Sequence, residues 1–165
     1  MVEIRESIRP TDRSNLAESP GIAGGLPGLI SLQLALIGLI VWPFGAQRFG
    51  VIFWNVIIAS IALGSYTLRH NRLGNFNIRP EPKATARLIT SGAYRLIRHP
   101  MYSTLLLAAA AFVVAENSWL KLGLWITLGL VLVTKASYEE QLMSKKFSDY
   151  SAYRARTKRF APYLF

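Results

Sequence analysis

The chain has 165 residues, a formal net charge of +10 and a hydrophobic content of 52%. Its apolar residues come in long blocks, and the lysines and arginines fall between these blocks. A soluble nucleic-acid binder spreads its positive charge over amphipathic elements, so we expect no nucleic-acid partner. The absence of cysteine excludes disulfides, thiolate metal sites and a cysteine nucleophile. Two histidines are too few for a zinc site without carboxylates, so no metal is expected.

The first half of the chain contains two long uncharged stretches. Residues 1–25 are polar and carry both signs of charge, which indicates a solvated tail with no secretory signal. Residues 26–44 and 50–68 follow, each with 19 residues and no charge. At about 1.5 Å per residue, such a stretch crosses a hydrocarbon core roughly 30 Å thick. Each also carries a tryptophan near one end, where interfacial aromatic residues lie. We predict two membrane-spanning helices here.

Two shorter apolar stretches follow, at residues 101–115 and 119–134, separated by a predicted tight turn at Asn117 and Ser118. Lys121 interrupts the second stretch, and we expect its ammonium group to snorkel to the membrane interface. A shallow re-entrant hairpin is the alternative to two full spans. The predicted fold is therefore all-α, a polytopic membrane protein with about four transmembrane helices, the last two a short hairpin, and with cytoplasmic interfacial helices.

The distribution of basic residues indicates how the chain is oriented. Seven lie in residues 69–98, seven in residues 135–159 and three in the tail, out of 19 in all. Four spans place these three segments on one side, which the positive-inside rule makes cytoplasmic. Three or five spans would separate the two richest segments. We therefore predict cytoplasmic termini, a tail over 1–25 and a single transmembrane domain over 26–165.

Polar groups within the spans need partners, because the bilayer core holds no water. We expect Gln33 and Asn55 to form hydrogen bonds between helices rather than to contact a substrate. Ser60 and Gly64 are spaced four residues apart, a small-xxx-small pattern that allows close helix packing or dimerisation. The oligomeric state stays open.

Two polar segments contain candidate site residues. Pro100 suits the first turn of a helix and disfavours a helical His99, so Arg98 and His99 are expected at a helix N-terminus. Backbone N–H groups there favour an anion, although by residue type alone such a pair at a membrane edge is more often a contact with lipid headgroups than a ligand site. Glu139 and Glu140 follow the last span. Adjacent helical positions point about 100° apart, so we expect at most one of the two to face a given pocket.

Together these motifs resemble the isoprenylcysteine carboxyl methyltransferase and phospholipid methyltransferase superfamily of integral membrane enzymes. The resemblance covers residues 73–162, in matching order and spacing. It is specific to the superfamily but not to one substrate. The matching residues are Gly92, Tyr94, Arg98, His99, Pro100, Tyr102, Glu139, Glu140, Leu142, Phe147, Tyr150, Tyr153, Arg159, Phe160 and Pro162.

The resemblance implies S-adenosylmethionine as the methyl donor and a lipophilic acceptor, such as an isoprenylcysteine-type carboxylate, that arrives through the bilayer. It implies a site on the cytoplasmic face over residues 73–162, and we place the protein in a prokaryotic inner membrane. Arg98 and His99 are the catalytic candidates. The implied cofactor-binding residues are Tyr94, His99, Pro100, Tyr102, Glu139, Glu140, Tyr153 and Arg159.

The chain departs from the family pattern at two positions. Ala93 replaces the usual proline, and Thr104 replaces a glycine found in many members, where a side chain is expected to narrow the pocket floor. Two rival functions remain. One is an NADPH-dependent sterol-type membrane reductase, which shares the Arg-His-Pro-x-Tyr pattern but commonly has other residues at Met101 and Ser103. The other is a non-enzymatic membrane scaffold.

Overall fold

The computed structural model describes residues 26–71 and 88–162, and within these ranges every long element is helical. The predicted tail, the glycine-rich lead into the first span and the segment 73–76 lie outside the described residues. The helices are α2 (Leu26–Val41), α3 (Val51–His70), α4 (Pro100–Glu116), α5 (Trp119–Lys146) and α6 (Tyr150–Arg156), with a short 3₁₀ turn η3 (Gly92–Arg95). The all-α prediction is confirmed for this part of the chain.

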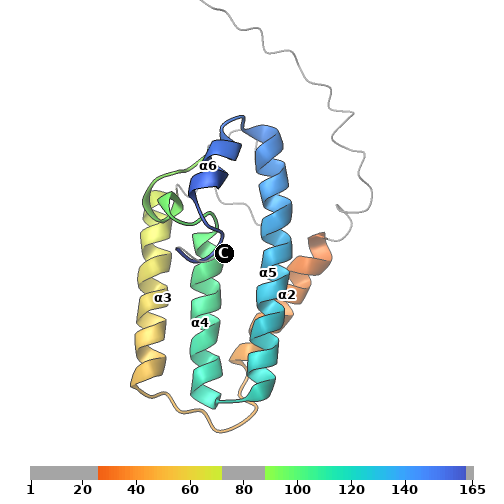
Figure 1. Ribbon diagram of the computed structural model, residues 1–165. Helices are drawn as coiled ribbons and strands as arrows, with labels where there is room; N and C mark the ends of the chain where they lie inside the picture. The colour runs from red at the N-terminus through yellow and green to blue at the C-terminus, as the bar shows by residue number, and fades with distance from the viewer. Residues whose placement is uncertain (1–25, 72–87, 163–165) are drawn as a thin grey trace, which may run out of the picture.

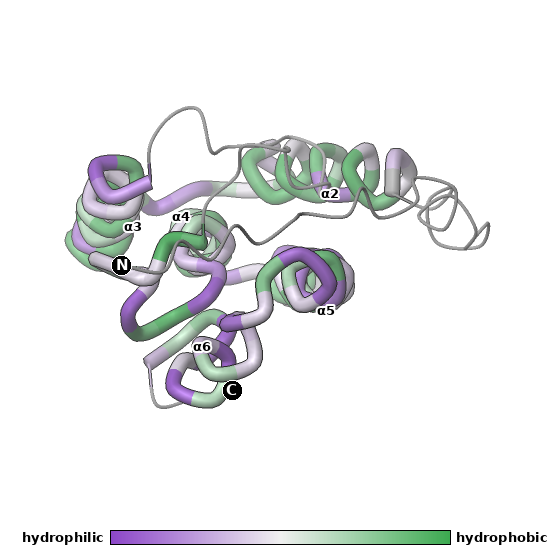
Figure 2. Tube along the Cα trace, turned by 90° about the horizontal axis from the view of Figure 1, so that it is seen from above, coloured by the Kyte–Doolittle hydropathy of each residue, from purple (hydrophilic) through white to green (hydrophobic). Residues whose placement is uncertain are grey.

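Three long helices, α3, α4 and α5, lie side by side with α4 in the middle, and α2 runs obliquely against α5 (Figure 1). The view from above shows the same order, with α2 tilted away from the common direction of the others (Figure 2). The short α6 lies at the end of the bundle where α4 begins (Figure 1). The segments that carry the candidate site residues therefore gather at one end.

Two of the four long helices, α3 and α5, are long and apolar enough to cross a membrane. The other two, α2 and α4, are apolar but have only 16 and 17 residues. The prediction of four spans is thus confirmed by length and composition for two helices only. The hairpin itself is as predicted, because Asn117 takes a left-handed conformation after α4 and α5 begins two residues later.

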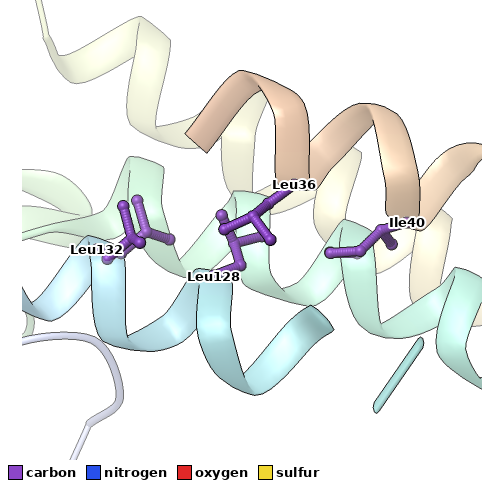
Figure 3. Packing of buried hydrophobic residues seen from close by; sticks show 6 residues of the cluster. Leu36, Ile40, Leu128 and Leu132 are labelled. Carbon is purple, nitrogen blue, oxygen red and sulfur yellow. The ribbon is translucent and has the colours of Figure 1, made fainter. Parts of the chain in front are cut away.

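The main core lies between α2 and α5. Its buried residues include Leu36 and Ile40 of α2 and Leu128 and Leu132 of α5. Figure 3 shows Leu36 lying against Leu128. Lipid tails are as apolar as leucine, so close van der Waals packing rather than escape from water stabilises such a contact in a bilayer. The complementary fit of these side chains is what holds α2 in its oblique position.

The small residues of α3 pack against α4 of the same chain. Ser60 Oγ donates a hydrogen bond to the backbone oxygen of Thr104 at 2.9 Å. A Cβ atom placed on Gly64 would stand 3.0 Å from Thr104 Cγ2. The small-xxx-small pair therefore serves close packing within the molecule. The Thr104 side chain, a departure from the family pattern, lies against this glycine of α3.

The prediction that Lys121 snorkels outward is wrong. Its side chain is fully buried, and Nζ lies 2.6 Å from Oε2 of Glu116. Glu116 is the last residue of α4, five positions earlier across the hairpin turn. A carboxylate within reach neutralises the ammonium group, which removes the need to extend it to water.

The two polar residues within the first spans have different surroundings. Gln33 Oε1 accepts a hydrogen bond from Lys135 Nζ at 2.6 Å, so the predicted bond between helices is confirmed for Gln33. Asn55 is exposed on α3 and forms no hydrogen bond with another helix of the described chain, so the prediction is wrong there. Its place one turn from the start of α3 explains why no partner is needed, since a helix end can reach the membrane interface.

Candidate functional site

The site begins where α4 begins. His99 is the N-cap residue, with φ −122° and ψ 59°, and Pro100 occupies the first helical position. The proline ring sets φ for the first turn and lacks the N–H that would have no helical partner. The predicted placement of Arg98 and His99 at a helix N-terminus is therefore confirmed.

The C-terminal segment pairs with the backbone just before α4. Arg98 N donates to Lys158 O at 2.7 Å, His99 N donates to Arg159 O at 3.0 Å, and Lys158 N donates to Leu96 O at 3.0 Å. These bonds make one parallel bridge between Ile97 and Lys158. They bring Arg159 beside His99, although the two residues are 60 positions apart in the sequence.

Glu140 is the centre of the charged cluster. Its side chain is 3% exposed, and Oε1 accepts from Arg98 Nε at 2.9 Å. Arg159 donates through Nε to Oε1 at 3.2 Å and through Nη2 to Oε2 at 3.3 Å. His99 Nε2 lies 3.3 Å from Oε1, and the exposed Arg154 lies 3.8 Å from Oε2. A buried carboxylate needs such compensation, because desolvation of an unpaired charge is costly.

Glu139 faces the same histidine from its other side. Its Oε2 lies 3.5 Å from His99 Nδ1, and its Oε1 accepts a hydrogen bond from the Tyr102 hydroxyl at 2.6 Å. The side chain is 23% exposed, so this carboxylate borders solvent while Glu140 does not. The rings of His99 and Tyr102 are stacked, with centroids 5.4 Å apart and planes 7° from parallel.

The two glutamates share one histidine, while the expectation that at most one of them faces a given pocket stays a prediction. Both contact His99, because the imidazole lies between them and offers one nitrogen to each. A glutamate side chain is long enough to compensate for the 100° that separates adjacent helical positions. The predicted residues Arg98, His99, Tyr102, Glu139, Glu140 and Arg159 thus form one contiguous cluster.

The electrostatic surroundings of His99 favour its charged form. Burial lowers the pKa of the imidazole, but hydrogen bonds and charges of Glu139 and Glu140 outweigh burial and raise the pKa above its ordinary value of 6.5. Protonated His99 donates to both carboxylates at once.

This raised pKa predicts a loss of stability in the alkaline range. The contribution of His99 is fully present below pH 6.5, its pKa in the unfolded chain, and is lost as the pH rises through the raised pKa. We expect the melting temperature of the detergent-solubilised protein to exceed that of a His99→Gln variant most at pH 6, and the gap to narrow toward pH 9. A gap of constant size over this range would show that His99 is not charged in the folded protein.

Tyr94 and Tyr153 lie beside the cluster rather than in contact with its carboxylates. Asn71 Nδ2, at the end of α3, donates to the Tyr94 hydroxyl at 3.1 Å, and the Tyr153 hydroxyl donates to Tyr94 O at 2.8 Å. Burial raises the pKa of Tyr94 to about 12 and that of Tyr153 further above its ordinary value of 10. Both phenols therefore stay neutral. Their hydrogen bonds connect η3 with the end of α3 and with α6.

Several residues near the cluster were not singled out from the sequence. Thr157 accepts from Arg98 Nη1 through its backbone oxygen, and no sequence signal marked it. Lys135 lies one helical turn before Glu139, a spacing that could have identified it. An open pocket of about 470 Å³ is lined by Thr90, Arg95, Tyr153 and Arg156, none of which belongs to the cluster. Residues 26–71 and 88–162 hold no group of three metal-ligating side chains.

Comparison with known proteins identifies the reaction class. Residues 44–150 match the model of the phospholipid methyltransferase family. A search of curated proteins found no match. The matched region contains the start of α4, the hairpin and both glutamates, so the resemblance noted in the sequence is confirmed. Members of the family are membrane methyltransferases that act on lipid-related substrates, and methyl transfer is accordingly the reaction class of this protein.

Proposed function

We propose, because this chain belongs to the phospholipid methyltransferase family, that it transfers a methyl group from S-adenosylmethionine to a lipophilic acceptor at the cytoplasmic membrane face. An isoprenylcysteine-type carboxylate is the acceptor we favour. The observation that carries this proposal is the convergence of Arg98 and His99 with Glu139 and Glu140 at one end of the bundle. The first pair precedes α4, and the second pair lies near the end of α5.

The chemistry of the cluster fits the proposed donor. When bound, S-adenosylmethionine supplies a methyl group on a cationic sulfur, and its amino group is also cationic. Glu139 borders solvent and offers a carboxylate to such groups. Glu140 keeps Arg98, His99 and Arg159 in fixed positions, and Pro100 sets the start of the helix. Tyr94 and Tyr153 support this arrangement from the side.

Positioning is the main task of the protein in methyl transfer, since donor and acceptor must be in line. A carboxylate acceptor needs no general base. An amine or thiol acceptor would first lose a proton, and Glu139 is the partly exposed carboxylate able to accept it. Arg98 and His99 are the proposed catalytic pair. Their backbone N–H groups bond to the C-terminal segment at the start of α4, which fixes the position of both side chains.

We further propose four spans for the single domain over residues 26–165, with α2 and α4 crossing a locally thinned bilayer. The basic segments before α4 and after the apolar part of α5 then lie on one side, and the positive-inside rule makes that side cytoplasmic. Both termini are cytoplasmic in this topology, and a prokaryotic inner membrane is the proposed location. A site at this membrane face can be reached by a soluble donor from the cytoplasm and by a lipophilic acceptor from the bilayer.

Calorimetry on the purified protein in detergent tests the donor. We expect saturable binding of S-adenosylmethionine and none of NADPH. His99→Ala should weaken donor binding by about 1–3 kcal/mol, the usual cost of lost hydrogen bonds to charged groups. His70→Ala is the matched control, since among the described residues this half-buried histidine forms its hydrogen bond with Tyr66 O of its own helix, outside the charged cluster, and its loss should leave donor affinity unchanged.

Each other outcome points to a different function. Binding of NADPH without S-adenosylmethionine would favour the reductase. Binding of neither would favour the scaffold. Wild-type donor affinity in His99→Ala would remove His99 from the site.

A further inference from the structure

Lys135 is a buried cation for which residues 26–71 and 88–162 provide no paired carboxylate. Its side chain lies where the apolar part of α5 ends, one helical turn after the buried Val131 and Leu132, and the residue is 6% exposed. Within the described part of the chain, Nζ donates a hydrogen bond to Gln33 Oε1 at 2.6 Å and stands 5.4 Å from the centre of the Tyr102 ring. Both partners are neutral. A buried charge without a counter-ion is costly, and such a residue at the edge of a membrane span is a candidate for a functional site.

The second buried lysine of α5 shows how this chain neutralises such a charge for structural purposes. Lys121 lies 2.6 Å from Glu116, whereas none of the ion pairs of the described residues includes Lys135. Glu139 is the nearest carboxylate along the helix, one turn away, but its two oxygens face Tyr102 and His99. The same helix thus contains one lysine with a built-in counter-ion and one without.

The charged cluster does not supply the missing anion. Its two carboxylates, Glu139 and Glu140, already face three basic partners, Arg98, Arg159 and His99. Lys135 adds a further positive charge, beside Tyr102 and within reach of Gln33 of α2. A lysine ammonium has three donors, and the bond to Gln33 uses one of them. The interior of the bundle next to Tyr102 therefore presents unused donors and an excess of positive charge.

We propose that Lys135 and Gln33 form a binding site for an anionic group, a carboxylate or a phosphate, of the lipophilic acceptor. This inference rests on the proposed function for the identity of the acceptor. Gln33 aims the ammonium group from α2, a helix outside the matched family region. The apolar residues around Lys135 suit a lipophilic molecule more than the polar donor, which we place at the charged cluster. The site thereby selects acceptors by charge before methyl transfer.

Binding measurements without the donor test this site. The probes are a prenyl thioether carboxylic acid, its primary amide, and nanodiscs of phosphatidylglycerol or phosphatidylcholine. We expect the wild-type protein to bind the acid about tenfold or more tightly than the amide, the effect of one charge-assisted hydrogen bond. Lys135→Met should abolish this preference and Lys135→Arg should keep most of it. Lys145→Met removes an exposed charge from the same helix and should leave the preference intact.

A second neutral variant, Lys135→Gln, retains a side-chain donor for Gln33 and replaces Lys135→Met if the latter does not fold. A preference for phosphatidylglycerol alone, lost in the Lys135 variants, supports the site with a phospholipid as the source of the anion. Equal binding of acid and amide, or a preference that survives in Lys135→Met, overturns the inference. If Lys135→Met instead lowers the affinity for S-adenosylmethionine and leaves the acid preference unchanged, the inference is overturned too, because the anion would then belong to the donor. Absent methyl transfer with an intact acid preference would sink the proposed function and leave this site standing.

Discussion

Glu140→Gln is expected to abolish methyl transfer and to lower the free energy of unfolding by about 3–5 kcal/mol, the cost of breaking a buried ion pair by removing one partner. The substitution keeps the shape of the side chain but removes the charge that Arg98, Arg159 and His99 share. These cations then repel one another in a buried place. Arg98 and Arg159 then lose the carboxylate that both of them bind, although each lies in the backbone pairing that precedes α4. We therefore expect the start of α4 to shift relative to the end of α5.

Unfolding in mixed micelles, followed by circular dichroism, gives the change in stability, and a labelled-donor assay gives the activity. Glu139→Gln is the matched control, because it makes the same change one residue earlier on a more exposed side chain. It should reduce donor affinity while costing less stability than Glu140→Gln. Equal stability losses in the two variants would contradict the central place of Glu140.

The second large effect is expected at Gly92, in the turn before Arg98. Gly92 has φ +61°, and a Cβ atom there would stand 2.4 Å from Cγ of His70. Gly92→Ala is expected to lower the free energy of unfolding by about 2–5 kcal/mol, from the left-handed backbone and the overpacking together. A displaced turn moves Tyr94 and the residues that follow, so activity should fall by up to about 100-fold, the cost of a misplacement of roughly 1 Å.

Gly123→Ala is the control for this prediction. Gly123 lies within α5 with nothing within 4 Å of an added Cβ, so its replacement should be neutral or stabilise the helix by about 0.5–1 kcal/mol. The double variant Gly92→Ala/His70→Ala removes the ring that the new methyl group meets and should recover part of the loss. A stability of Gly92→Ala equal to that of Gly123→Ala would show that the turn adapts without cost.

The local features of the chain could be predicted from sequence because they depend on neighbouring residues. The apolar blocks identified the long helices, and Pro100 identified the start of α4. Asn117 marked the turn of the hairpin. The spacing of the motif residues selected nearly all the side chains that meet around His99. Helix starts, turns and apolar length follow from backbone sterics and hydrophobicity over a few residues, so they need no knowledge of the partner helices.

The side-chain partners depend on contacts between distant segments, and only the tertiary structure decided them. The packing of the helices and the return of the C-terminal segment decide which carboxylate is buried and why both glutamates reach His99. They also decide why Lys121 has a carboxylate partner, whereas Lys135 bonds to Gln33. A shift of one turn along α5 would exchange these partners without changing a residue. The sequence by itself therefore determined the family, a family of membrane methyltransferases, and the motif residues. The packing of α2, α4 and α5 decided which of the charged side chains are neutralised within the protein.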